Sequence, residues 1–296
     1  MRLALVALLA VPIAAPPAAA QDADTLTAAD GWRQSLVATL AGNQARFVNW
    51  QEGGVDALAV SGSLDGQFDR VVGNVLTTQT LRLALGALQQ DTLSVRKALD
   101  VVRYAAAAEV GADRPLRPAV TASVRSQFAP GFDYAPAAED YPALPVVAGE
   151  PLKVSDAFAP LVLAQTVGVA WRPGGGVVAR TGLGLKETVV GIRRLRPVHG
   201  NAPDQAVRVE AGLDAELVLE RGLMENVVLR SRLATFQGFG QIGEAAPDAV
   251  LETVLLLKVN GLLNVTLDGA ALYDADVDRR VQLREALSVG VSVGLL

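Results

Sequence analysis

Apolar and polar residues alternate with a period of two through most of the chain. In residues 206–220 the odd positions are apolar, whereas the even positions include Arg208 and Glu216. Successive side chains of a β-strand point to opposite faces, so this segment predicts a strand with one apolar and one charged face. A helix does not fit, because charges at every second position would surround it on all sides. Residues 250–260 and 281–296 repeat the pattern.

The alternation predicts about twelve strands, each of roughly 10–16 residues. They are expected near residues 32–42, 55–66, 72–87, 99–111, 116–128, 156–172, 176–188, 205–220, 222–237, 248–260, 262–274 and 281–296. The connections between them alternate in length. Short connections are expected at 65–69, 112–115, 172–176, around Arg221 and at 259–261. Long connections are expected at 43–54, 88–98, 129–155, 189–204, 238–247 and 275–280.

This sorting of the connections predicts the fold class: an all-β chain that forms an antiparallel transmembrane up-and-down β-barrel of about 12 strands. Such barrels have short periplasmic turns and longer outer loops, and an even strand number places both chain ends in the periplasm. A soluble β-sandwich has no reason to sort its loops in this way. In water the apolar faces would aggregate, whereas a closed barrel in lipid satisfies its own backbone hydrogen bonds.

The polar strand faces are expected to line the lumen, and they carry charges of both signs. Neighbouring strands place Asp214 and Glu216 near Arg230 and Arg232, which predicts ion-pair ladders inside the barrel. A surface that selects a solute is the alternative, although a barrel of this size is narrow and its side chains can largely fill it. The expected lumen residues are Arg82, Arg103, Arg117, Arg125, Arg180, Lys186, Arg208, Glu210, Asp214, Glu216, Arg230, Arg232, Glu252, Lys258, Asp268 and Arg284.

Composition and the N-terminus place the chain outside the cytoplasm. Of 296 residues, 51% are apolar and 19% are charged, with a mean hydropathy of +0.31, which is more apolar than an average soluble domain. Residues 1–20 place Arg2 before an apolar run that ends in small residues, which predicts a signal peptide cleaved after Ala20. We therefore expect a short periplasmic segment at 21–31 and a barrel over 32–296, in the outer membrane of a Gram-negative bacterium.

Few residues offer catalytic or metal-binding chemistry. The chain has no cysteine and a net charge of −5, which excludes a cysteine metal site and argues against a nucleic-acid-binding surface. The only histidine, His199, lies in a loop without serine, so we interpret it as solvated and expect neither an enzyme nor a metal site. Residues 172–176, RPGGG, lack the lysine of a phosphate-binding loop and predict a turn. No cofactor is expected.

The long outer loops hold the remaining binding candidates, which are Asn49, Trp50, Phe132, Asp133, Tyr134, Arg193 and Arg194. Trp50 precedes a glycine pair and is either a packing anchor or a ligand contact. The basic residues at 193–196 are either solvated or attract an anion such as a lipopolysaccharide phosphate. The longest loop, 129–155, folds either into the lumen or over the mouth of the barrel, since loops of this length are usually functional or mobile.

Three short sequence words resemble one known family. Residues 49–54, NWQEGG, resemble an N-W-x-x-G-G word, and residues 126–134, SQFAPGFDY, resemble a QFAPGYDY word with Phe132 in place of tyrosine. Residues 255–278 resemble the last hairpin of the same family, in which a K-V-N turn precedes a strand ending in Tyr-Asp-Asp. The family consists of outer-membrane β-barrel proteins of unknown function, known mainly from Bacteroidota. The resemblance implies the fold and the location, and it implies no substrate or reaction.

Three functions are compatible with these predictions. The first is a narrow or plugged channel, or an uptake protein, for an unidentified small solute. The second is a barrel whose outer loops bind a partner protein or envelope component without transport. The third, a barrel hydrolase, lacks a recognisable catalytic triad. The expected partners are outer-membrane lipid, lipopolysaccharide and, during biogenesis, the barrel-assembly machinery, with no nucleic acid among them.

Overall fold

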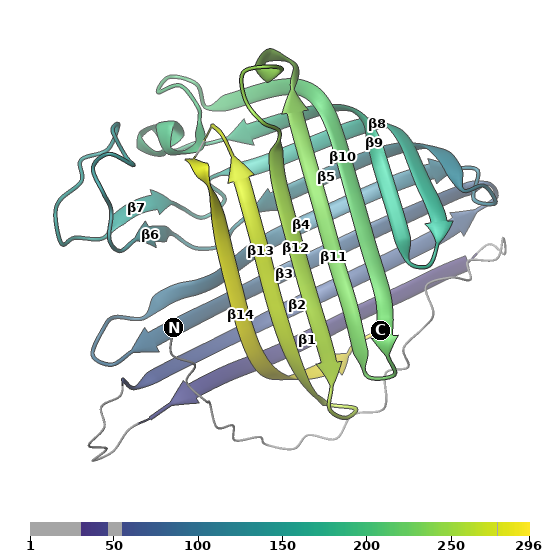
Figure 1. Ribbon diagram of the computed structural model, residues 1–296, viewed down its shortest axis with the longest axis horizontal. Helices are drawn as coiled ribbons and strands as arrows, with labels where there is room; N and C mark the ends of the chain where they lie inside the picture. The colour runs from purple at the N-terminus through teal and green to yellow at the C-terminus, as the bar shows by residue number, and fades with distance from the viewer. Residues whose placement is uncertain (1–30, 47–54, 277) are drawn as a thin grey trace.

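The computed structural model describes residues 31–46, 55–276 and 278–296, which form one closed β-barrel (Figure 1). Its twelve strands pair antiparallel in chain order, and β14 pairs with β1 to close the barrel. The predicted fold class is therefore confirmed, including the number of strands. The expected signal peptide, the segment 21–30 and the loop residues Asn49 and Trp50 lie outside the described residues.

Each barrel strand corresponds to one predicted segment, although some bounds differ by five or six residues. They are β1 (Gly31–Ala45), β2 (Ala57–Val72), β3 (Val75–Gln90), β4 (Arg96–Val110), β5 (Leu116–Ser126), β8 (Leu161–Gly174), β9 (Val177–Val189), β10 (Val207–Met224), β11 (Val227–Gly238), β12 (Asp248–Lys258), β13 (Leu263–Asp274) and β14 (Asp278–Gly294). The long loop between β5 and β8 contains a separate hairpin, β6 (Gly131–Asp133) and β7 (Leu152–Ser155). Two short 3-10 helices, η1 (Arg193–His199) and η2 (Phe239–Gln241), lie in later loops.

The long connections lie together at one end of the barrel, and the short turns lie at the other. Gly31 pairs with Val71 beside the turn that joins β2 and β3, so the described chain begins at the short-turn end. It also ends there, because Val291 of β14 pairs with Leu263, the first residue of β13 after the short turn that follows β12. The predicted connection at 88–98 is shorter than expected, since β3 and β4 extend into it. The predicted long connection at 275–280 is a short turn, since β13 ends at Asp274 and β14 begins at Asp278. The other predicted long connections are the observed ones.

Two short turns were predicted at the wrong positions. Residues 65–69 continue β2 instead of turning. Within this stretch Asp69 faces the lumen and is only 2% exposed. The chain turns after β2 at Gly73, whose φ of 56° favours glycine. Arg221 likewise lies inside β10, which continues to Met224 before the chain turns. In both cases a strand extends several residues beyond the point at which the alternation weakens.

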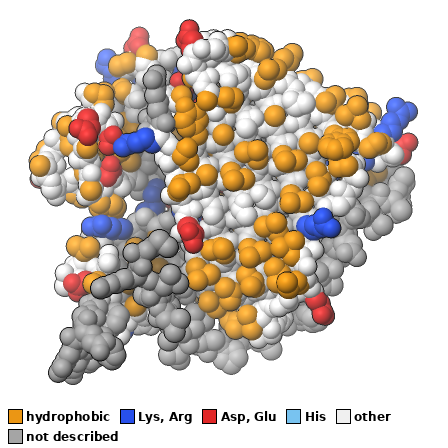
Figure 2. Space-filling view, viewed as in Figure 1, with side chains coloured by type: hydrophobic (Ala, Val, Ile, Leu, Met, Phe, Trp, Pro, Cys, Tyr) orange, Lys and Arg blue, Asp and Glu red, His pale blue; other side chains and the backbone are white. Residues whose placement is uncertain are grey.

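The outward face of the barrel is apolar. Leu40, Val167 and Leu183 are 64%, 65% and 63% exposed, and Figure 2 shows hydrophobic side chains spread over the visible wall. Trp32 and Trp171 both lie near the short-turn end, where a membrane protein places aromatic residues at the lipid–water interface. The exposed face therefore has the composition of a surface that contacts lipid.

Charged residues interrupt this face at few points. Arg70 lies near the short-turn end and stacks over the ring of Trp32, 5.1 Å from its centroid. Glu285 lies further along β14, is exposed, and forms no ion pair with a described residue. We have no physical account of this carboxylate on an otherwise apolar surface. No helix among the described residues is long and apolar enough to cross a membrane.

Glycines allow β8 and β9 to approach closely. Gly168 lies opposite Gly182 in the register of the two strands. A Cβ atom on Gly168 would lie 2.0 Å from the carbonyl oxygen of Thr181, and one on Gly182 would lie 2.3 Å from the carbonyl oxygen of Val167. Both distances are far shorter than a van der Waals contact, so a side chain at either position would push the strands apart.

Substitution of Gly168 with alanine should therefore destabilise the barrel by about 1–3 kcal/mol, the usual cost of overpacking. The same change at Gly222, where an added Cβ would have no other atom within 4 Å, should have little effect. The measurement is the temperature at which the folded band converts to the unfolded band in gel electrophoresis. Equal conversion temperatures for the two variants would contradict the close approach of β8 and β9.

Candidate functional site

The lumen is the candidate site, because the inward faces of the strands bring charged residues together there. Arg103 on β4 contacts Glu252 on β12 through both terminal guanidinium nitrogens, and the Nη1–Oε2 distance is 2.5 Å. β4 and β12 lie six positions apart in the twelve-strand order, on opposite walls of the barrel. This ion pair therefore spans the lumen from wall to wall.

The same network continues along the wall formed by β9, β10 and β11. The Nη1 atom of Arg232 lies 3.4 Å from Glu252, and its Nε lies 2.6 Å from Glu216. Arg180 then bridges two carboxylates, with Nη1 2.9 Å from Glu216 and Nη2 3.1 Å from Glu109. Arginine can serve two partners at once because its guanidinium group presents five N–H donors.

Glu109 is the most enclosed carboxylate of the network. Its side chain is 1% exposed and contacts three guanidinium groups, those of Arg117, Arg172 and Arg180. The nearest of these contacts, from Arg172 Nε to Glu109 Oε2, measures 2.6 Å. A buried carboxylate needs such pairing, since an uncompensated one would be strongly destabilising. The cluster joins the four neighbouring strands β4, β5, β8 and β9 near the short-turn end of β4.

A second group of ion pairs lies on the other side of the lumen. The Nη2 atom of Arg82 on β3 donates to Asp268 on β13 at 2.9 Å, and its Nε lies 3.8 Å from Asp65. Arg284 contacts the other oxygen of Asp268 at 2.7 Å. β3 and β13 are separated by β2, β1 and β14 in the sheet order, so this group also joins non-adjacent strands.

A third group lies toward the long-loop end. Lys186 contacts Asp248 at 2.5 Å and Glu210 at 3.2 Å, and Arg208 contacts Glu210 at 3.3 Å. Arg208 also contacts Asp276 in the turn between β13 and β14, and Gln241 of η2 donates to the same carboxylate at 2.9 Å. These contacts fix two outer connections to the barrel wall.

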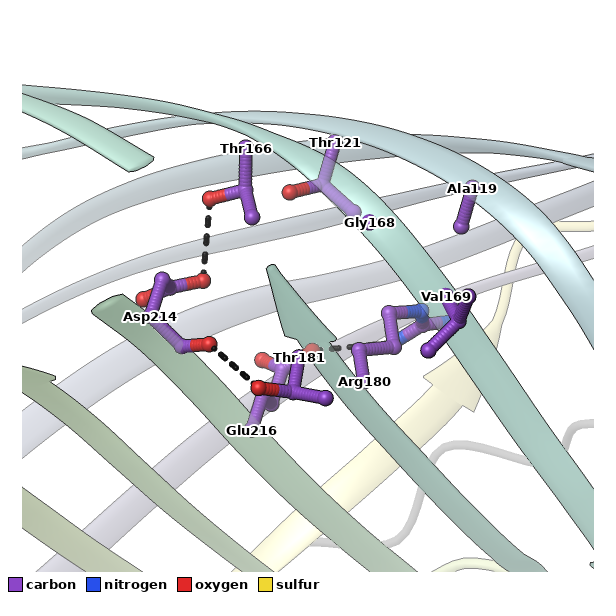
Figure 3. Close-up of a pocket in the computed structure, with 9 residues that line it drawn as sticks. All are labelled: Ala119, Thr121, Thr166, Gly168, Val169, Arg180, Thr181, Asp214 and Glu216. Carbon is purple, nitrogen blue, oxygen red and sulfur yellow. Dashed lines mark hydrogen bonds and ion pairs between the residues drawn. The ribbon is translucent and has the colours of Figure 1, made fainter. Parts of the chain in front are cut away.

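The expected ladder between β10 and β11 forms only in part. Arg232 pairs with Glu216, as expected, but Arg230 pairs with Glu220, which lies opposite it in the register. Asp214 lies opposite Phe236 and instead accepts a hydrogen bond from Thr166 Oγ1 at 3.0 Å. Figure 3 shows this pair beside a small void of about 20 Å³, which is large enough for about one water molecule.

The longest loop spans the mouth of the barrel instead of entering the lumen. Its two ends are joined where Ser126 Oγ donates to the carbonyl oxygen of Pro160 at 2.8 Å. On one side the carboxylate of Asp100 accepts hydrogen bonds from the backbone of Phe128 and Ala129. On the other side of the mouth, Asp140 of the loop contacts Arg280 of β14 at 2.8 Å. Strand β14 is five positions from β5 in the order of the sheet. In Figure 1 the hairpin of β6 and β7 lies beyond the ends of the barrel strands.

The candidates in this loop have different surroundings. Phe132 is 43% exposed. Asp133 accepts hydrogen bonds from the hydroxyl of Tyr141 at 3.0 Å and from the backbone of Ala135 at 2.9 Å. The ring of Tyr134 lies 4.1 Å from the guanidinium carbon of Arg96, in a cation–π contact. Asp133 and Tyr134 therefore hold the loop together, and Phe132 is the one of these three residues that faces outward.

His199 is not solvated, so that interpretation of the sequence is wrong. It lies at the end of η1, where its Nε2 is buried without a hydrogen-bond partner. Burial lowers the pKa of His199, and this effect outweighs a hydrogen bond with the backbone of Val154 and the nearby charge of Asp274, which act in the opposite direction. Arg193 and Arg194 of the same helix are exposed. The described residues contain no group of three or more residues suited to binding a metal ion.

Several residues of the network were absent from the sequence prediction. Glu109, Asp65, Asp248 and Asp276 all make ion pairs within the lumen or at its mouth. The alternation contains a signal for Glu109, because it shares odd-numbered positions of one strand with Arg103 and must face the same side. Asp276 lies in a turn, where alternation gives no direction.

Comparison with known proteins adds a partial family match. Residues 43–132 match the family described as "Protein of unknown function (DUF3078)", which is less than half of the chain. The word at 49–54 and most of that at 126–134 fall within this range. No curated protein matches the sequence.

Solved structures with a similar fold are outer-membrane barrels. The COG4313 outer membrane channel from Pseudomonas putida F1 is 8% identical, with 93% of this chain and 98% of that chain covered and a TM-score of 0.39. The translocator domain of the autotransporter NalP from Neisseria meningitidis is 12% identical, with coverages of 90% and 89% and a TM-score of 0.36. OmpF of Salmonella typhi, solved with daunomycin, is 9% identical, with coverages of 90% and 98% and a TM-score of 0.31. Likenesses this distant do not assign a function.

The half-buried His199 should make the packing of η1 depend on pH. Because its pKa is lowered in the packed state from an ordinary value of 6.5, the unpacked state binds a proton more readily. The packing is therefore fully kept above about pH 6.5 and weakens as the pH falls below it. Amide hydrogen exchange in residues 190–206, corrected for intrinsic rates, should show more opening at pH 5 than at pH 7.5. In the uncharged variant His199→Asn this difference should disappear, and its persistence would contradict the assignment to His199.

Proposed function

We propose that the protein is an integral β-barrel of a Gram-negative outer membrane, and that it acts as a closed channel that admits a small polar solute when its luminal ion pairs open. The apolar outward face supports the membrane location, since a patch of this extent would aggregate in water. The closed sheet supports it as well, because every barrel strand has a hydrogen-bonded neighbour on both sides and lipid offers no other partners.

The observation that carries the channel proposal is the ion pair between Arg103 and Glu252. It crosses the lumen, so it narrows the path at its own level while the wall beside it stays polar. Inward residues such as Thr80 on β3 and Ala286 on β14 are exposed, which indicates space beside the ion pairs. An obstruction made of two movable side chains is easier to open than a packed apolar core.

The energy of opening supports a gate in place of a permanent plug. The side chains of Arg103 and Glu252 are 18% and 25% exposed, so the pair lies between fully exposed pairs and fully buried ones. We take the cost of separating it as about 1–3 kcal/mol. A cost of this size leaves a minor population of open molecules at equilibrium.

A second function, recognition of a partner by the outer loops, is favoured by exposed aromatic residues at the mouth. Phe128 and Phe158 pack edge to face with ring centroids 6.4 Å apart and remain 39% and 56% exposed, and Phe132 is exposed nearby. Exposed aromatic residues beside a polar rim are typical of protein contacts. This function requires no passage through the lumen, so conductance separates the two.

Single-channel recording in planar lipid bilayers tests the channel. Glu252→Gln removes the carboxylate that pairs with Arg103. If the closed state is thereby destabilised by about 1.4 kcal/mol relative to the open state, the ratio of open to closed time rises about tenfold. Glu220→Gln is the matched control, because it breaks the ion pair with Arg230 near the short turns. The side chains of Glu220 and Arg230 are 37% and 57% exposed. We expect the control to behave as the unmodified protein. Folded protein that does not conduct in either the unmodified or the Glu252→Gln form would overturn the proposal.

A further inference from the structure

Arg125 differs from the other arginines that line the middle of the barrel. It lies on β5 directly opposite Arg103 in the register, so both side chains face the lumen. Arg82, Arg103, Arg180 and Arg232 each contact a carboxylate across or along the wall. Arg125 forms no hydrogen bond or ion pair with a described residue, and its side chain is exposed to the space inside the barrel. It is a cation that faces open space.

The charged groups around Arg125 leave its guanidinium group without a partner of its own. The groups that act on it most strongly are Arg103, Arg232, Glu252 and Asp274. Glu252 is shared by the first two of these, as described above. The second partner of Arg232 is Glu216, so Arg125 is the guanidinium group of this set that has no carboxylate within ion-pair distance. Inside a barrel wall an unpaired charge is screened less than on a protein surface.

The position of Arg125 makes it accessible from the mouth. It precedes Ser126, the last residue of β5, whose hydroxyl joins the two ends of the long loop. Arg125 therefore lies at the inner side of the loop, beside Arg103 of the crossing pair. A solute entering beneath the loop would meet Arg125 together with that pair.

We propose that Arg125 is the principal contact of a binding site for a small monocarboxylate solute. A carboxylate matches the guanidinium group, because its two oxygens accept two parallel N–H bonds. A single negative charge matches the one unpaired guanidinium group, whereas a dianion such as phosphate would bring a second negative charge beside Glu252 and Asp274. The site thus selects by charge as well as by shape. This inference rests on the proposed function for its role in transport, but binding can be measured without transport.

Isothermal titration of the folded, detergent-solubilised barrel at low ionic strength tests the site, with acetate as the probe. Acetamide, which has nearly the same shape and no charge, and inorganic phosphate serve as comparison solutes. Acetate should bind more tightly than either. Arg125→Gln should weaken acetate binding by at least about tenfold, the loss expected for a charge-assisted hydrogen-bonded pair.

Two further variants separate binding from folding. Arg125→Lys keeps the charge and loses the paired donors, so it should bind acetate with intermediate affinity, and it remains informative if Arg125→Gln does not fold. Arg230→Gln, near the short turns, should bind acetate as the unmodified protein does. Equal acetate affinity in all variants, or equal affinity for acetate and acetamide, would overturn the site.

Failure of the site and failure of the channel give different results. If acetate binds through Arg125 but Glu252→Gln never conducts, the binding site stands and the channel proposal falls. If Glu252→Gln conducts but neither the unmodified protein nor any variant binds acetate, the channel proposal stands and the carboxylate site falls.

Discussion

The structure depends on the closure of one sheet, in which Val37–Gly42 of β1 pair with Val289–Gly294 of β14. An open sheet would leave two edges of unpaired N–H and C=O groups, and lipid offers these groups no partners. Closure also gives every strand an inside and an outside, and so converts a period-two sequence pattern into an apolar exterior and a charged lumen. The β1–β14 contact brings together residues from the first and the last of the described strands.

The charged lumen follows from this closure and carries its own constraint. Arginine and glutamate that face inward cannot reach bulk water freely, so each is stabilised mainly by pairing. Glu109 satisfies the constraint with three guanidinium groups, and Arg103 satisfies it by reaching the opposite wall. Pairing across the lumen narrows the path, which is why the stability of the interior and the proposed gate depend on the same contacts. Arg125 is the exception, and its lack of a partner among the described residues is what makes it a candidate for binding.

The alternation predicted the fold well and the site less completely. Strands such as 116–128 and 248–260 were predicted within a few residues of β5 and β12, because each has one exposed apolar face. The pairing of Arg103 with Glu252 could not be predicted, since contacts across the lumen depend on the stagger of the strands as the barrel closes. The burial of His199 depends on how two loops pack, which alternation does not address. The sequence placed Arg125 in the lumen but gave no sign that it lacks a partner, because partners are set by register.

The most direct test of the account is the sidedness of the wall. The chain has no cysteine, so single cysteines can be introduced without background and labelled in lipid vesicles. Cysteines at Leu183 and Leu213, which face outward, should react with a membrane-confined maleimide and resist a water-soluble one. Cysteines at the inward positions Thr80 and Ala286 should show the reverse. Reaction of the outward positions with the water-soluble reagent, at the rate of the inward ones, would contradict a membrane-embedded barrel.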